Sequence, residues 1–274
     1  MTIDAPLDAP AIGVPLNGLV TSPILPTLLR LALPNTVAMF GSTLVAVAET
    51  SYIGRLGIEP LAAIALVFPF AMLAQMMSAG AMGGGVSSAV SRALGAGDHD
   101  RAASLALHAA IIGVGAGLFF TVMMLAFGRQ FFMILGGRGP VLEQACDYSH
   151  VLFSGAVAIW LVNTLASVLR GTGDMRLPSA ILMAAALVQI IVGGTFGLGL
   201  FGLPQFGMRG VAAGQLTAFA LGAAFLLWYL ASGRSLLKLK FSAFRFQRGM
   251  FIDILKVGVI ACLSPLQSVL TILI

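Results

Sequence analysis

The sequence predicts an all-α integral membrane protein, a six-helix transmembrane bundle followed by a truncated seventh helix. Of its 274 residues, 59% are hydrophobic and only 9% are charged, whereas an ordinary soluble domain has about 25% charged residues. The mean hydropathy is +1.01. Apolar runs recur at lengths that suit a bilayer, whose hydrocarbon core of about 30 Å is crossed by a helix of about 20 residues.

Helices are the expected spanning elements because each satisfies its own backbone hydrogen bonds in lipid. A membrane β-barrel would instead show segments of about ten residues with strictly alternating hydrophobicity. The sequence contains no such pattern, so the helical bundle is the prediction.

The apolar runs predict six complete spans and divide the chain into four regions. The predicted spans cover about residues 27–53, 61–90, 102–127, 147–169, 178–201 and 208–231. We expect a disordered cytoplasmic tail at 1–22, a six-helix lobe at 23–232 and a basic cytoplasmic connector at 233–256. The chain turns apolar again at Val257 and ends at Ile274, which we interpret as a truncated start of a second lobe. A six-helix unit with a long connector suggests one lobe of a two-lobed transporter.

Lys and Arg are unevenly divided between the two sides of these spans. The side of the N-terminus holds Arg30, Arg92, Arg101, Arg170, Arg176, Arg234, Lys238, Lys240, Arg245, Arg248 and Lys256. The other side holds only Arg55, Arg129, Arg138 and Arg209. Because positive residues accumulate on the cytoplasmic side, we expect a cytoplasmic N-terminus.

Several other classes of function find no support. The net charge of +5 comes from residues between apolar segments rather than from a basic, aromatic-rich domain, so no nucleic-acid partner is expected. Cys146 and Cys262 have neither metal nor redox spacing. No nucleophile–base pair or metal-ligand cluster is evident. We therefore expect neither an enzyme nor a bound cofactor or metal.

Glu49 is the one carboxylate inside the first span, and it lies on a polar face. Asn35, Ser42 and Glu49 are spaced by seven, which places them nearly above one another on a helix. A charge at a helix centre costs about 2.5–3.5 kcal/mol on insertion scales and is usually functional. Glu49 is therefore either a proton or cation site facing an internal cavity, or an end residue that reaches the interface near Arg55.

Polar residues of other spans could line the same cavity. These cavity-lining candidates are Gln75, Asn163, Ser167, Gln189 and Gln215. The alternative is that they only hydrogen-bond neighbouring helices. Pro34 and Pro69 each remove a backbone hydrogen bond within a span and are hinge candidates. The glycine cluster from Gly80 to Gly85 lacks the lysine of a phosphate loop and indicates close packing with a flexible kink.

Four local patterns, one in each expected loop, resemble the multidrug and toxic compound extrusion (MATE) family of antiporters over about residues 27–274. They are Glu49, Thr50, Gly54, Arg55, Gly57 and Leu61; Ser91, Arg92, Gly95, Gly97 and Asp98; Leu169, Arg170, Gly173, Asp174 and Pro178; and Gly199, Gly202, Pro204, Gly207 and Gly210.

The resemblance implies a twelve-helix, two-lobed transporter, of which this chain is the first lobe, with the second lobe missing. Such proteins lie in the plasma membrane, here expected to be a bacterial inner membrane. They export amphipathic, often cationic, small molecules across it in exchange for protons or sodium ions. The family's acidic residue of the first span, usually aspartate, falls on Glu49. Gln189 and Gly193 stand where asparagines are common, and Gln267 where some members carry glutamate, so protons are favoured over sodium.

Three alternatives stay open at this point. A lipid-linked oligosaccharide flippase of the same superfamily would be expected to carry several mid-span cations, and we find none. A seven-helix photoreceptor would want a lysine midway along the last helix, but Lys256 lies at its start. The third alternative is a non-transporting fragment.

Overall fold

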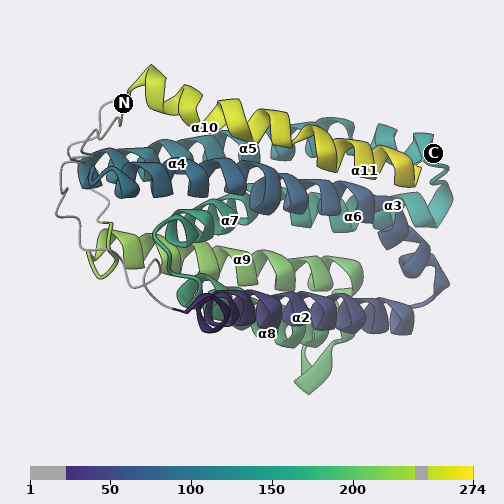
Figure 1. The fold of residues 1–274 in the computed structure, drawn as a ribbon. Coiled ribbons are helices and arrows are strands. Elements are labelled where there is room, and N and C mark those ends of the chain that lie inside the picture. The colour runs from purple at the N-terminus through teal and green to yellow at the C-terminus, as the bar shows by residue number, and fades with distance from the viewer. Residues whose placement is uncertain (1–22, 238–245, 274) are drawn as a thin grey trace, which may run out of the picture.

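The computed structural model describes residues 23–237 and 246–273, almost all of them in helices (Figure 1). The predicted tail at 1–22 lies outside the described residues, as does the middle of the predicted connector. The elements are α2 (Ile24–Leu56), α3 (Ile58–Gln75), the π-helical segment η1 (Met76–Met82), α4 (Gly83–Gly95), α5 (His99–Ile134), α6 (Gly139–Ser154), α7 (Ala156–Gly171), α8 (Arg176–Leu198), η2 (Leu200–Gly202), α9 (Gly207–Ala231), α10 (Arg248–Ala261) and α11 (Leu263–Leu273).

Seven segments of the described chain are long and apolar enough to cross a membrane. Six are helices, counting Ile58–Gly95 and Arg248–Thr271 as one each, and the other is the pair α6 and α7, bent by 47°. Large apolar side chains remain exposed along these segments, including Phe40 on α2 and Phe119 on α5. The chain is therefore a multi-pass, all-α membrane protein, as the sequence predicted.

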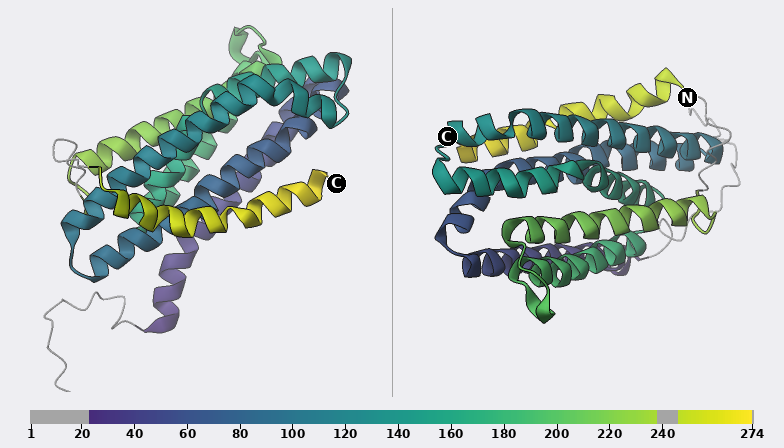
Figure 2. Two further views of the ribbon diagram at one scale, coloured as in Figure 1. Left: turned by 90° about the horizontal axis from the view of Figure 1, so that it is seen from above. Right: turned by 180° about the vertical axis from the view of Figure 1, so that it is seen from behind.

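The helices form two layers (Figure 1). Helix α8 packs most extensively against α9 and α2, and these three form one layer. The other contains α3 to α7 with α10 and α11, whose yellow ribbon crosses the neighbouring helices obliquely in the left view of Figure 2. Helices α6 and α7 pack on α9 and so join the layers. Contacts between α2 and α3 are few, which leaves room between the layers on that side.

Glycines permit the closest helix approaches. At the α8–α9 contact, a Cβ on Gly214 would overlap the backbone of Gly193. At the contact of α4 with α10, a Cβ on Gly85 would lie 2.9 Å from the carbonyl oxygen of Ile254. Small residues let helix backbones approach in this way in membranes. Within the glycine cluster, Gly83 and Gly85 make the predicted close contacts, whereas a Cβ on Gly80 or Gly84 would meet nothing within 4 Å. The cluster begins inside the π-helical segment η1, and the flexible kink stays a prediction.

Two predicted boundaries need correction. The fourth span was expected from about Asp147, but helix begins at Gly139, with Pro140 in its first turn, and bends at Gly155. The last helix was expected from Val257 but begins at Arg248. Hydropathy detects only the apolar part of a helix, and the first turns of α10 are held by polar contacts instead. The Gln247 N–H donates to His108 Nε2 at 2.9 Å, and Arg101 pairs with Asp253 at 2.9 Å.

Helix α2 runs unbroken through Pro34, and α3 runs unbroken through Pro69. In the left view of Figure 2 the first turns of α2, in purple, lean away from the other helices. Whether either proline acts as a hinge stays a prediction.

We expect Gly214→Ala to destabilise the fold, because the added methyl group would force α8 and α9 apart. Overpacking of this kind typically costs about 1–3 kcal/mol. Gly115→Ala is the matched control, since a Cβ on Gly115 meets nothing within 4 Å. Thermal unfolding in detergent would measure both variants. Equal melting temperatures for the two would contradict the assigned packing.

Candidate functional site

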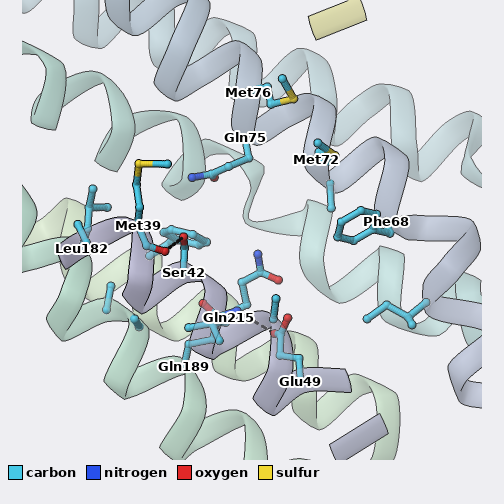
Figure 3. A pocket seen from close by; sticks show the side chains of 18 of the residues that line it. Met39, Ser42, Glu49, Phe68, Met72, Gln75, Met76, Leu182, Gln189 and Gln215 are labelled. Carbon is cyan, nitrogen blue, oxygen red and sulfur yellow. Dashed lines mark hydrogen bonds between the residues drawn. The ribbon is translucent and has the colours of Figure 1, made fainter. Parts of the chain in front are cut away.

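A cavity of about 430 Å³ lies between the two layers (Figure 3). Its walls come mainly from α2, α3, α8 and α9, with Tyr148 contributed by α6 and Arg170 by α7. Much of its surface is apolar and flexible, formed by Met39, Phe68, Met72, Met76 and Phe219. Thioether and aromatic side chains of this kind adapt to ligands of different shapes.

Most of the predicted site residues lie on this cavity. The predicted residues that line it are Asn35, Ser42, Glu49, Gln75, Gln189 and Gln215. The seven-residue spacing aligns Asn35, Ser42 and Glu49 on one face of α2. Helix α2 packs against α8 and α9. Asn163 and Ser167 do not line the cavity and are buried behind it, at about 1% exposure each.

Glu49 contacts α8 through its carboxylate. Gln189 donates a hydrogen bond from Nε2 to Glu49 Oε1 at 2.8 Å, and the Gln189 side chain is itself buried. Across the same region the Tyr148 hydroxyl donates to Gln215 Oε1 at 3.4 Å. Glu49 is thus directed to the Gln189 amide, and among the described residues it forms no ion pair with Arg55, the residue near the alternative interfacial position. The carboxylate is therefore an internal group on a cavity wall.

A second polar group lies behind the cavity where α3 and η1 meet α7. Asn163 Nδ2 donates to Ser78 Oγ at 2.8 Å and to Gln75 Oε1 at 3.2 Å. Ser167 Oγ donates to the backbone carbonyl of Asn163 at 2.8 Å. These bonds give the amide nitrogen of Asn163 partners that lipid could not supply, although the buried Asn163 Oδ1 has no partner among the described residues. They also fix the side chain of Gln75, which extends into the cavity in Figure 3.

Two residues that line the cavity were not predicted from the sequence. Arg170 was assigned to a cytoplasmic turn, but it lies in the last turn of α7 and lines the cavity. The predicted fourth span ended one residue before Arg170, and no spacing pattern distinguished a cavity-lining arginine from a flanking one. Tyr148 was not among the candidates, although it lies at the start of the predicted fourth span. Among the described residues no cluster of His, Cys, Asp or Glu could hold a metal ion.

The comparisons with known proteins agree with this geometry. A family model described as MatE matches residues 34–195, which is more than half of the chain. The chain belongs to the MatE family. Two solved MatE relatives have the same fold over 87% of this chain. One, a MOP superfamily transporter from Pyrococcus furiosus whose description reports a reverse polarity of the binding pocket, has a TM-score of 0.81 at 30% identity. The other, a multidrug resistance MATE family transporter in an outward-facing conformation, has a TM-score of 0.80 at 31% identity.

Several curated proteins that are similar to this MatE chain are named as transporters or as multidrug resistance proteins. An FAD transporter from Shewanella oneidensis is 30% identical over 73% of this chain and 44% of its own length. A probable multidrug resistance protein, NorM from Thermotoga maritima, is 24% identical over 74% of this chain and 44% of its own length. A multidrug export protein, MepA from Staphylococcus aureus, is 24% identical over 89% of this chain and 53% of its own length. The chain thus spans about half the length of these relatives.

We expect Ser42→Cys to react with a hydrophilic maleimide in membranes, because Ser42 lines the cavity. Thr43→Cys is the matched control, since Thr43 is next along α2 but lies outside the cavity lining. Both changes belong in a background with Cys146 and Cys262 replaced by alanine. Labelling measured by mass spectrometry should be much faster at position 42. Equal rates at the two positions would show that this face of α2 borders no water-filled space.

Proposed function

We propose that the protein is a secondary active transporter that exports amphipathic, often cationic, small molecules by ion-coupled antiport through alternating access. The observation that carries this proposal is the carboxylate of Glu49 on the wall of a largely apolar cavity, with Gln189 as its hydrogen-bond partner. A cavity lined by methionine and phenylalanine suits ligands chosen by shape and apolar area. The multidrug names of relatives from Thermotoga maritima and Staphylococcus aureus support the same class of substrate.

Protons are the coupling ion we favour. The neighbour of Glu49 Oε1 is an amide N–H, a donor, whereas a hard cation would want several oxygen ligands directed at it. A proton needs only the carboxylate. Sodium coupling would require Gln189 to turn its carbonyl oxygen toward the site and further oxygens to join it.

In the mechanism that follows, protonation from outside neutralises Glu49 and weakens its bond with Gln189. Helix α2 can then re-pack at Pro34 and narrow the cavity, so that the substrate leaves. Release of the proton to the cytoplasm restores the bond. A proton moving through 100 mV supplies about 2.3 kcal/mol, which corresponds to a concentration ratio of about fiftyfold.

Orientation and location complete the proposal. The excess of Lys and Arg on the N-terminal side favours a cytoplasmic N-terminus, and we place the protein in the plasma membrane, which is the inner membrane in a bacterium. An oligosaccharide flippase is less well supported, because Arg170 is the one cation among the lining residues of the described cavity.

We expect Glu49→Gln to abolish coupled efflux, because the amide cannot take up and release a proton. The full-length gene product would be tested in inverted membrane vesicles with a fluorescent dye such as ethidium, driven in turn by a proton gradient and a sodium gradient. Glu59→Gln is the matched control, since Glu59 is an exposed carboxylate at the start of α3. Efflux at the wild-type rate by the Glu49 variant would refute the assignment, and efflux driven by sodium alone would refute the choice of ion.

A further inference from the structure

Arg170 gives the cavity a second charged group, far from Glu49. Glu49 and Arg170 are the only charged side chains among the described residues that line it. Arg170 lies in the last turn of α7, just before the turn that leads into α8 at Arg176. Gln189, the partner of Glu49, lies 13 residues further along α8, about 20 Å along its axis from that turn. The two charges are therefore placed toward opposite ends of the cavity.

The Arg170 side chain leans into the cavity rather than away from it. Side chains on a helix tilt toward its N-terminus, so a residue in the last turn of α7 is directed back toward Asn163 and Gln75. Arg170 is half-buried. No hydrogen bond or ion pair joins its guanidinium to any other described side chain. Asp174, the acidic residue nearest to it in sequence, instead accepts hydrogen bonds from the backbone N–H groups of Arg176 and Leu177 at the start of α8.

Gln75 presents a second donor to the same part of the cavity. Its Oε1 accepts from Asn163 Nδ2, which leaves the two hydrogens of Gln75 Nε2 for the cavity. Ser78 Oγ, whose hydroxyl donates to the backbone carbonyl of Gln75 at 3.2 Å, accepts the second hydrogen bond from Asn163 Nδ2 at 2.8 Å. In Figure 3 the Gln75 side chain extends from α3 toward the space beside Met39 and Ser42.

We propose that Arg170 and Gln75 form an anion-binding subsite at the α7–α8 end of the cavity, which takes a phosphate or carboxylate group of an amphipathic substrate. A guanidinium with no partner among the described side chains is strongly favoured to bind an anion away from bulk water, because charge-assisted hydrogen bonds to phosphate and carboxylate are about twice as strong as neutral ones. The apolar body of the ligand then lies along the methionines and phenylalanines. The cavity thereby accepts anionic and zwitterionic molecules as well as cations. This inference rests on the proposed transport function for its biological meaning, but binding alone tests it.

FMN and riboflavin are suitable probes because they differ only in a phosphate group. Fluorescence anisotropy would measure their binding to the full-length gene product in phosphatidylcholine nanodiscs, without any ion gradient. We expect the wild-type protein to prefer FMN by about tenfold, the effect of one hydrogen bond to a charged group. Arg170→Gln should remove this preference and leave riboflavin binding unchanged, whereas Arg170→Lys should keep part of it. Arg176→Gln is the matched control, because Arg176 is exposed and does not line the cavity.

The proposal is overturned if the wild-type protein does not prefer FMN or if the Arg170→Gln variant keeps the preference. It is also overturned if Arg170→Gln weakens the binding of FMN and riboflavin equally. The last result would mark Arg170 as structural. Because no gradient is used, the subsite can fail while coupled efflux through Glu49 stands, and the reverse is equally visible.

Gln75→Glu provides an independent test of the subsite. The substitution keeps the size of the side chain but replaces the amide donor by a carboxylate that repels phosphate. We expect FMN affinity to fall by about tenfold or more, with riboflavin affinity unchanged. Unaltered FMN binding would remove Gln75 from the subsite.

Discussion

Hydrocarbon offers no partner to a polar group, and this constraint organises the whole bundle. Apolar side chains can face lipid on every helix, but each carboxylate, amide or hydroxyl must find a partner inside the protein or in a water-filled space. Glu49 and Gln189 satisfy one another across α2 and α8. The Asn163 Nδ2 group donates to Ser78 and Gln75 across α7, η1 and α3. The polar residues therefore gather between the layers, where the cavity lies.

Some helix pairs in the bundle are tightly packed, whereas others make few contacts and leave room for the cavity. Glycines bring α8 against α9 and α4 against α10 until their backbones touch, while α2 and α3 make few contacts with each other. This combination is compatible with the proposed alternating access, because tightly packed helices can move together as a unit while loosely packed helices separate. The π-helical segment after Gln75 and the bend between α6 and α7 interrupt regular helix within two spans, and π-helical turns are frequent at functional sites.

In the proposed mechanism, charge placement within the cavity separates two tasks. Glu49 lies against a buried amide, in surroundings where gain or loss of a proton changes a single interhelical hydrogen bond. Arg170 lies about two helical turns along α7 from Asn163, whose side chain is hydrogen-bonded to Gln75. In our proposal Arg170 and Gln75 hold a substrate group without displacing the coupling proton from Glu49.

Hydropathy and helical periodicity were enough to determine the spanning helices, their order and the polar face of α2, because these depend on each segment alone. Asn35, Ser42 and Glu49 share a wall since residues seven apart share a face on any helix. Helix ends at Gly139 and Arg248 were not predictable, because polar first turns are stabilised by contacts with other helices. Only the tertiary structure decided that Gln189 is the partner of Glu49, that Asn163 and Ser167 lie behind the cavity, and that Arg170 lies on it. The physical reason is that a sequence fixes which residues share a helical face, whereas the packing of neighbouring helices fixes where that face is turned.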